Sequence, residues 1–327
     1  MLKQQFDKPV MILRRKLDGE NSIEELAYHF KRSMDIELII LPYSSQRVFD
    51  IIKNILFIKT IKAPVFHFIS TEAYLLPFVK GKKIITYHDL GTINNSRNKL
   101  YRFVRRSLFI YPSKYYADDI TFISNQSLIE YKNFVKTKRT DNFHVIYNPY
   151  DERLKPTSSK KNNKFTILHI GTAERKNLVS TIKACAGLDI KLIIIGKLNQ
   201  NQKEALNECQ TDYENLYDIS YEEIIKFYGC CDIVSFPSSY EGFGLPIIEA
   251  NVMKKPIFAG DIPILHEVAN DSALFVNPNN INEVRNVIKQ LMENEALRND
   301  LISKGTINAK RFEQKIIIKQ YEELYNE

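Results

Sequence analysis

The chain has 327 residues, a length that predicts two domains at about 100–200 residues each. Hydrophobic residues make up 44% and charged residues 26%, which excludes collagen-like, low-complexity and wholly disordered proteins. No apolar run approaches the roughly 18 residues needed to cross a bilayer, and Met1 to Arg15 lacks the continuous apolar segment of a secretory signal. We therefore expect a cytoplasmic protein.

The net charge of +7 is unevenly distributed along the chain. Residues 1–152 contain 24 Lys and Arg against 16 Asp and Glu, whereas residues 153–327 contain 22 against 23. The longest acid-free stretch, Leu90–Ala117, holds Arg97, Lys99, Arg102, Arg105, Arg106 and Lys114. This asymmetry predicts an anionic partner for the first half: membrane lipid, a phosphate-bearing substrate or nucleic acid.

Short β-branched apolar segments alternate with helical patterns in chain order. Runs such as Ile193-Ile194-Ile195 do not alternate with polar residues, which indicates strands covered on both faces of a parallel sheet. Helical patterns at Ser180–Gly187, Tyr221–Cys230 and Asn282–Asn294 separate such strands, and this alternation predicts α/β architecture. The predicted strands are Val10–Leu13, Ile36–Leu41, Pro64–Ile69, Lys83–Tyr87, Ile120–Ser124, His144–Tyr147, Phe165–Ile170, Ile190–Ile195, Asp232–Phe236, Pro256–Ala259 and Ala273–Val276.

A polar stretch, Asp151–Lys164, is the best candidate for a linker because a new strand follows it at once. It predicts two doubly wound domains, residues 1–152 and 153–308. In such sheets ligands bind at the carboxyl ends of the strands, and we expect a cleft between the two domains there.

The segment Ser238–Ala250 carries the strongest chemical signal. After the strand ending at Phe236 come a loop with Gly242 and Gly244 and then Pro246, a residue suited to a first helical turn. Glycines let the backbone approach a ligand, and amides at a helix N-terminus suit a phosphate. Carboxylates beside a phosphate site would accept hydrogen bonds from sugar or ribose hydroxyls, whereas the alternative is a tight turn with a capping acid. These carboxylates are Glu241 and Glu249.

The segment from Glu241 to Glu249, Glu-Gly-Phe-Gly-Leu-Pro-Ile-Ile-Glu, resembles the two-glutamate signature of the retaining, nucleotide-sugar-dependent glycosyltransferases of family four, the "group 1" transferases with the GT-B fold. Four further segments resemble landmarks of that family in the right order. They are Thr86–Leu90, Ala117–Ser124, Val145–Asp151 and His169–Leu178. The resemblance covers most of the chain and implies an acceptor domain, then a donor domain, with a final helix at about 309–327 packing back on the first.

The resemblance also implies roles for individual residues of the donor domain. Glu249 is expected to bind the ribose and Glu241 the donor sugar. Lys176 and Arg175 are expected to neutralise the departing diphosphate without a metal ion, although a solvated loop pair is the alternative. Backbone groups around the donor are expected from Gly242, Phe243, Gly244, Leu245, Gly171 and Thr172.

This sequence departs from the family pattern in two loops. Many relatives have Gly-Arg where Gly171-Thr172 stands, so the arginine's role is expected to pass to Arg175. Relatives also have a Gly-Gly pair in the first loop of the acceptor domain, where this chain has one glycine, Gly19. Gly19 is expected to bring the backbone near the diphosphate.

His88 follows a predicted strand and precedes Asp89. In the family the matching histidine contacts the donor sugar near the reacting carbon, so we expect a catalytic-site role; a structural pair with Asp89 is the alternative. The other histidines and the four cysteines lack metal-ligand spacing, and we expect reduced thiols and no metal site. These residues are His29, His67, His144, His169, His266, Cys185, Cys209, Cys230 and Cys231.

The acid-free stretch has helical periodicity. Its apolar positions form one stripe, and Arg102, Arg105 and Arg106 lie largely off it. One interpretation is a core-facing helix with a solvated basic side, and the other is a helix whose arginines meet an acceptor's pyrophosphate or anionic lipid. The stripe consists of Leu100, Phe103, Val104, Leu108 and Tyr111.

Together these features predict a retaining hexosyltransferase that uses a UDP- or GDP-sugar and a glycan or lipid-linked acceptor in cell-envelope polysaccharide synthesis. We expect no cofactor or metal, no nucleic-acid partner, and possible residence at the inner face of the membrane. A nucleotide-sugar epimerase of the same fold is the main alternative, and a basic nucleic-acid-binding protein is a weaker one because no motif for it is present.

Overall fold

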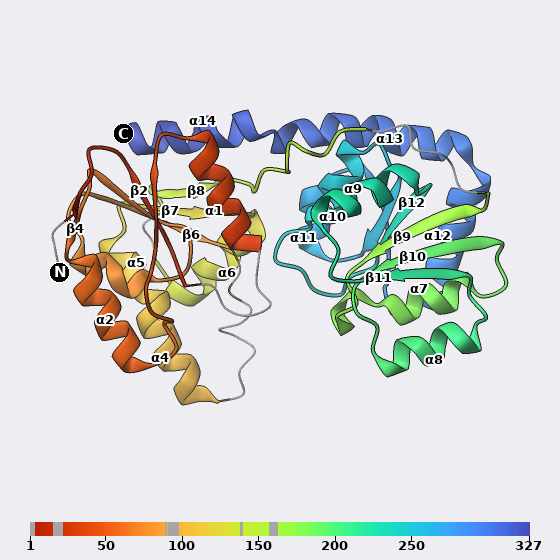
Figure 1. Cartoon of the computed structure of the whole chain (residues 1–327), viewed down its shortest axis with the longest axis horizontal. Helices are drawn as coiled ribbons and strands as arrows, with labels where there is room; N and C mark the ends of the chain where they lie inside the picture. The colour runs from red at the N-terminus through yellow and green to blue at the C-terminus, as the bar shows by residue number, and fades with distance from the viewer. Residues whose placement is uncertain (1–3, 16–21, 89, 91–97, 138–139, 157–162) are drawn as a thin grey trace. The chain divides into compact units, whose positions relative to one another are not determined.

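The computed structural model describes residues 4–15, 22–88, 90, 98–137, 140–156 and 163–327. It divides into two compact units (Figure 1). Unit 1 comprises Met1–Asn148 with Lys315–Glu327, and unit 2 comprises Pro149–Gln314. The sequence placed these divisions after residues 152 and 308.

Unit 1 is built on a six-stranded sheet in which every pairing is parallel. Numbered within this sheet along the chain, the strands follow the order 2-1-3-4-5-6, a doubly wound arrangement. A second, two-stranded pair joins β1 (Gln4–Gln5) to β4 (Ile61–Lys62). The six strands are β3 (Glu37–Ile40), β2 (Val10–Leu13), β5 (Val65–Phe68), β6 (Lys82–Tyr87), β7 (Asp119–Phe122) and β8 (Phe143–Val145).

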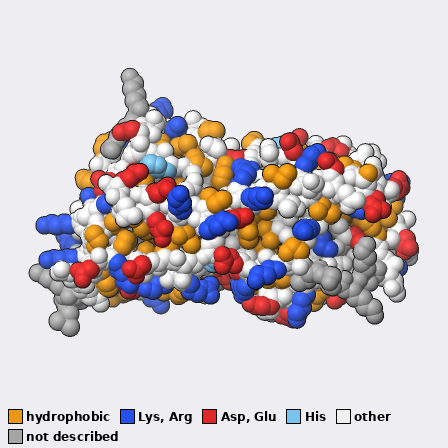
Figure 2. Space-filling view, turned by 90° about the horizontal axis from the view of Figure 1, so that it is seen from above, with side chains coloured by type: hydrophobic (Ala, Val, Ile, Leu, Met, Phe, Trp, Pro, Cys, Tyr) orange, Lys and Arg blue, Asp and Glu red, His pale blue; other side chains and the backbone are white. Residues whose placement is uncertain are grey.

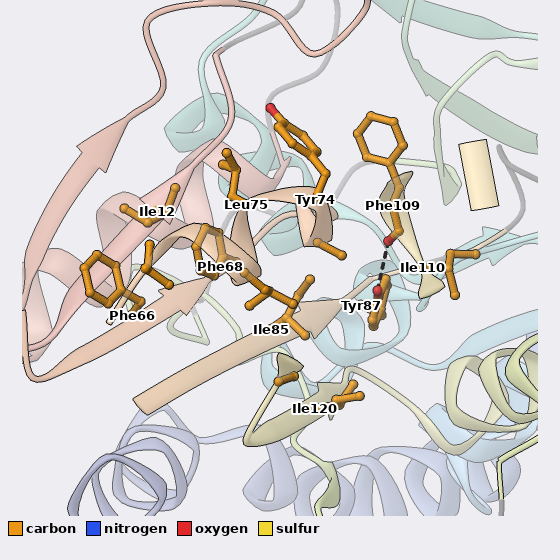
Figure 3. Close-up of a cluster of buried hydrophobic side chains, with 14 of the residues drawn as sticks. Ile12, Phe66, Phe68, Tyr74, Leu75, Ile85, Tyr87, Phe109, Ile110 and Ile120 are labelled. Carbon is orange, nitrogen blue, oxygen red and sulfur yellow. Dashed lines mark hydrogen bonds between the residues drawn. The ribbon is translucent and has the colours of Figure 1, made fainter. Parts of the chain in front are cut away.

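Both faces of this sheet are buried because successive strand residues point to opposite sides. Val10 and Ile12 of β2 enter one core, whereas Met11 and Leu13 enter the other. The first core, shown in Figure 3, lies under α2 (Val48–Ile58), η1 (Ala73–Phe78), α4 (Lys99–Phe109), α5 (Tyr111–Tyr116) and α6 (Asn125–Val135). The second lies under α1 (Ser22–Ser33) and α14 (Gln314–Asn326).

The last helix, α14, packs on unit 1. Tyr325 Oη lies 2.6 Å from His67 Nδ1 of β5, and Lys82 Nζ donates to the carbonyl of Leu324 at 2.6 Å. Tyr321 meets the ring of Phe30 edge-on. The sequence expected one helix from about residue 309, but Ala309 still ends α13 (Glu295–Ala309), and a short turn, η3 (Lys310–Phe312), separates it from α14.

Unit 2 also has a six-stranded, wholly parallel sheet. Its order, 3-2-1-4-5-6 within the sheet, is that of a dinucleotide-binding fold. The sequence missed its edge strand β11, because none of its four residues is fully buried and two of them are polar. The strands are β11 (Tyr213–Leu216), β10 (Ile190–Ile195), β9 (Phe165–Ile170), β12 (Ile233–Phe236), β13 (Ile257–Gly260) and β14 (Ala273–Val276).

Helices cover both faces of this second sheet (Figure 1). One face packs under α7 (Leu178–Cys185), α8 (Gln200–Glu208) and α12 (Ile281–Glu293), with Leu301 of α13 joining that core. The remaining helices are α9 (Tyr221–Cys230), α10 (Leu245–Val252) and α11 (Pro263–Ala269). Within the described residues, no helix is both long and apolar enough to cross a membrane.

The strand orders predict where each unit binds ligands, because crevices open where the order reverses. In unit 2 that point lies between β9 and β12, beyond Ile170 and Phe236. In unit 1 it lies between β2 and β5, beyond Leu13 and Phe68.

Candidate active site

The turn after β9 places Lys176 at the reversal point of unit 2. Gly171 has φ +92°, a conformation that favours glycine, and a Cβ there would lie 3.1 Å from Lys176 Cε. The lysine stem therefore runs closely over the glycine backbone, and its ammonium lies 4.5 Å from the Phe236 ring centroid. Burial lowers the pKa of Lys176, and the neighbouring Glu241 opposes that shift.

Glu241 joins this turn to the loop after β12. One of its carboxylate oxygens lies 2.6 Å from Lys176 Nζ and 2.8 Å from an Arg175 guanidinium nitrogen. Arg175 also donates to the carbonyl of Tyr240, and the amide of Ser239 donates back to the carbonyl of Arg175. Two loops that are more than sixty residues apart in sequence thus form one cluster.

The glycine-rich segment adds a helix N-terminus to this cluster. Gly244 has φ +125°, and a Cβ there would lie 2.8 Å from Leu265 Cδ2, so a larger residue would be strained in both respects. Helix α10 begins directly afterwards at Leu245, with a proline in its first turn. The ring of Phe243 is buried against that of Phe312, which anchors this loop.

Two tyrosines of α9 hold the second glutamate of the signature. Tyr221 and Tyr228 donate hydrogen bonds to the two oxygens of Glu249 at 2.8 and 2.6 Å. Burial raises the pKa of Glu249, whereas the tyrosines lower it. The sequence analysis did not find this pair, because Tyr221 and Tyr228 precede the signature by a whole strand.

Both oxygens of Glu249 retain a further lone pair, so the carboxylate can accept hydrogen bonds from the hydroxyl groups of a ligand in addition to those from the tyrosines. Nearby, Lys176, Arg175 and Glu241 carry a combined formal charge of +1 beside the positive end of α10. The arrangement suits a ligand with both an anionic group and adjacent hydroxyls.

The model of the family "Glycosyl transferases group 1" matches residues 151–307, a range that contains this whole cluster. This part of the chain belongs to the group 1 glycosyl transferases. The predicted family is thereby confirmed, and so is the GT-B fold, because both units have the expected doubly wound sheets and solved GT-B transferases resemble nearly the whole chain.

Curated relatives of this chain include the O-antigen chain mannosyltransferase RfbU of Salmonella typhimurium. The two are 26% identical over 233 residues, which cover 68% of this chain and 64% of the relative. The O-antigen chain mannosyltransferase B of Escherichia coli is 32% identical over 91 residues, 28% of this chain and 24% of the relative. The aligned regions thus span less than two thirds of these relatives.

Solved structures show the same fold over a longer range. A glycosyltransferase from Rickettsia africae matches 98% of this chain and 97% of its own, with TM-score 0.77 and 18% identity. HepE from Anabaena, solved in complex with UDP-glucose, matches 97% of this chain and 99% of its own, with TM-score 0.78 and 15% identity.

His88 lies at the carboxyl end of β6 in unit 1. It is buried, and its Nε2 donates to the carbonyl of Ile69 at 2.9 Å, so Nδ1 is the unprotonated nitrogen in the neutral ring. Burial lowers its pKa to about 4. Asp89, its proposed structural partner, lies outside the described residues, as does Gly19.

A group of polar residues that the sequence analysis missed gathers where the order of the unit 1 sheet reverses. The amide of Arg14, after β2, donates to Ser70 Oγ after β5, and Arg14 Nε lies 3.6 Å from a carboxylate oxygen of Glu24. Glu72 is buried beside them, and this burial raises its pKa. The residues come from separate segments, so no local motif could have revealed them.

The three arginines of α4 lie differently from the prediction. The guanidinium carbon of Arg105 is 4.3 Å from the Phe109 ring centroid, and that of Arg106 is 4.5 Å from the Phe134 centroid. Arg102 is partly buried, while Leu100 and Phe103 of the predicted core stripe are exposed. The first of the two interpretations, a core-facing stripe with a solvated basic side, was therefore wrong: periodicity groups residues on a face but does not decide which face is inward.

The remaining predicted residues occupy supporting positions. Thr172 Oγ1 donates to the carbonyl of Lys197, which links the turn after β9 to the turn after β10. His67 and His169 are buried and hydrogen-bonded, and His144 and His266 each contact an aspartate. Among the described residues, no three His, Cys, Asp or Glu side chains are grouped so that they could hold a metal.

Proposed function

We propose that this protein transfers a hexose from a UDP- or GDP-sugar to a glycan or lipid-linked acceptor in cell-envelope polysaccharide synthesis, with retention of configuration. The group 1 match and the names of the relatives, two of them O-antigen mannosyltransferases, support the reaction class. The UDP-glucose complex of HepE supports a nucleotide-sugar donor.

The observation that carries the proposal is the cluster of Lys176, Arg175 and Glu241 beside the first turn of α10. A diphosphate leaving group develops negative charge as its bond to the sugar breaks. Preorganised cations and amides in a partly dry site stabilise such charge far more strongly than water does. The same cluster offers Glu241 to the hydroxyls of the sugar.

The proposed reaction proceeds on one face of the sugar. The bond between the anomeric carbon and the β-phosphate oxygen breaks as the acceptor hydroxyl oxygen bonds to that carbon. The proton of that hydroxyl passes to the departing phosphate oxygen, so charge and atoms balance without a covalent enzyme intermediate. Lys176 and Arg175 bind the diphosphate, and Glu249 accepts hydrogen bonds from the ribose.

We further propose that no metal ion or cofactor takes part. The diphosphate charge would be matched by Lys176, by Arg175 and by the amides before Pro246. When a donor binds, its phosphates compete with Glu241 for the two cations, which frees carboxylate lone pairs for the sugar. This exchange couples diphosphate binding to sugar binding.

A thermal-shift titration with UDP, GDP, UDP-glucose and GDP-mannose tests the proposal, because a ligand stabilises the folded state according to its affinity. We expect one base to be preferred and its sugar conjugate to shift the transition midpoint. Incubating the preferred donor with lipid-linked acceptors should then yield a glycosylated product. Conversion of the donor to an epimer, without transfer, would instead establish the epimerase alternative.

A further inference from the structure

Helix α2 in unit 1 is apolar on its outer side as well as its inner side. Asn54 and Ile58 are buried, yet Val48, Phe49, Ile52 and Leu56 also project outward, with Phe49 77% exposed. A helix that is apolar all round is normally covered on every side. The outer side of α2 therefore has the composition of an interface.

Helix α4 presents a second set of exposed apolar side chains. Leu100 is 71% and Phe103 is 63% exposed, and Tyr101 and Val104 are exposed beside them. The inward turn of Arg105 and Arg106 over aromatic rings leaves these residues outside. Both helices thus show apolar groups to solvent.

The two helices flank the same element. Asn54 of α2 donates to Tyr74 Oη of η1, and the Tyr74 ring meets the Phe109 ring of α4 edge-on, with centroids 5.6 Å apart. Figure 3 shows Tyr74 and Phe109 next to one another above the strands. We call the eight exposed side chains the apolar face: Val48, Phe49, Ile52, Leu56, Leu100, Tyr101, Phe103 and Val104.

The charges around the apolar face are almost all positive. Within residues 47–59 and 99–109 taken together there is one acidic residue, Asp50, and its carboxylate accepts a hydrogen bond from Ser44. Of the seven basic residues in these ranges, Arg47, Lys53, Lys59 and Lys99 are exposed, whereas Arg102, Arg105 and Arg106 are partly buried. Figure 2 looks onto the opposite, α14 side, where acidic and basic side chains are interspersed, as in the Lys319–Glu323 pair.

We propose that the apolar face is a docking surface for an anionic lipid leaflet. Phe, Leu, Ile and Val side chains enter the boundary between headgroups and acyl chains, while Lys and Arg reach the phosphates. A second copy of this chain fits less well, because a symmetric pairing would set one basic surface against another. The inference concerns membrane contact alone and stands apart from the proposed reaction.

The side chains that make the membrane contact in this proposal are not those that the sequence predicted. The sequence predicted a contact made by the arginines of α4. In the structure-based proposal, apolar side chains insert into the leaflet and basic residues add long-range attraction. Salt should consequently weaken binding without abolishing it, since apolar burial is not screened.

Co-sedimentation of the full chain with vesicles of equal parts phosphatidylglycerol and phosphatidylcholine tests the proposal. The double variant Phe49→Ser/Phe103→Ser should bind on the order of tenfold more weakly than the native chain. Ile307→Ser, which changes a 67% exposed residue of α13, is the matched control and should bind normally. Native-like binding by the double variant, or no binding by the native chain, would overturn the proposal.

Fluorescence gives a second measurement that does not depend on disruptive variants, because the chain contains no tryptophan. Phe49→Trp should show a blue shift on these vesicles and quenching by brominated lipid, while Ile307→Trp should show neither. An unshifted Trp at position 49 would contradict insertion even if the protein sedimented with the vesicles.

Two controls separate the other outcomes. Light scattering that shows a native dimer, lost in the double variant and without vesicle binding, would assign the face to self-association and overturn lipid docking. Nucleotide thermal shifts measured on the same variants should match the native chain, so failure of lipid docking and failure of the proposed transferase activity can be told apart.

Discussion

The two units share a parallel α/β architecture but use their charged side chains differently. In unit 2, Lys176 and Arg175 pair with Glu241 across neighbouring loops. In unit 1, Arg105 and Arg106 lie over aromatic rings, and apolar side chains of α2 and α4 face outward. One unit therefore concentrates charge in a small polar site, and the other combines charge with an exposed apolar surface.

The polar sites of the two units also differ in origin. The unit 2 cluster comes from two loops, each with its own short sequence signature. The unit 1 group after β2 and β5 is assembled from single residues such as Arg14, Ser70 and Glu72. The comparison shows that a polar site at the same kind of sheet edge can be formed either by short sequence motifs or by isolated side chains from separate segments.

The largest effect is expected from Lys176→Ala in unit 2. Loss of this cation removes stabilisation of the leaving diphosphate and leaves Glu241 with one cation fewer, so transfer should fall about 10²–10³-fold in kcat. Lys203→Ala, an exposed lysine of α8, is the control and should leave kcat unchanged. Near-native turnover by Lys176→Ala in a donor-saturated assay would place leaving-group stabilisation elsewhere.

A smaller effect is expected from Glu249→Ala, which should weaken nucleoside-diphosphate binding by roughly 1–3 kcal/mol. Calorimetric titration with UDP or GDP measures it. Tyr228→Phe removes one hydrogen bond to Glu249 but keeps the ring, so about 0.5–1.5 kcal/mol is expected there. Unchanged affinity in folded Glu249→Ala would exclude the ribose role.

Lowering the pH should destabilise unit 1 more than unit 2. Burial lowers the pKa of His67 to about 3, of His88 to about 4 and of His169 to about 3. Below pH 6.5, the ordinary pKa of histidine, these side chains bind protons in the unfolded chain but not in the folded chain. The free energy of unfolding therefore falls as the pH is lowered toward 4. Each histidine contributes a slope of up to about 1.4 kcal/mol per pH unit.

Two of these histidines belong to unit 1 and one to unit 2, so unit 1 should lose stability more steeply. Urea unfolding, monitored by amide hydrogen exchange at a series of pH values, would report the free energy of unfolding of each unit separately. Equal slopes in the two units would contradict this assignment, and His169→Asn should flatten the profile of unit 2 only.

The smallest effect is expected from chelation. With Lys176, Arg175 and the α10 N-terminus available to the diphosphate, transfer should be unchanged in excess EDTA. Loss of activity that Mg²⁺ or Mn²⁺ restores would show that the cations of unit 2 do not suffice. The assay needs the preferred donor and a saturating acceptor.

The sequence predicted the fold class and most of the sheet core. Val10–Leu13, Phe165–Ile170, Ile190–Ile195 and Ala273–Val276 are strands with the predicted bounds, because a short, nearly continuous apolar run is typical of a strand buried on both faces of a parallel sheet. The polar edge strand β11 was missed for the converse reason, since its pattern lacks that apolar signal.

The residues that the sequence singled out in unit 2 do lie together, because they belong to two short loops whose glycines impose their own backbone geometry. Gly171 and Gly244 have the positive φ values that such turns require. Local conformation is encoded locally, so a motif of a few residues was enough to place Lys176 and Glu241 at strand ends.

Only the tertiary structure decided which partners these residues have and which way α4 faces. Tyr221 and Tyr228 meet Glu249 because α9 packs beside α10, a contact that no spacing along the chain specifies. Periodicity placed Leu100 and Phe103 on one side of α4, but the rings of Phe109 and Phe134 attract Arg105 and Arg106 inward and leave that side exposed. A helix determines its own faces by its repeat, whereas its orientation depends on what the rest of the chain packs against it.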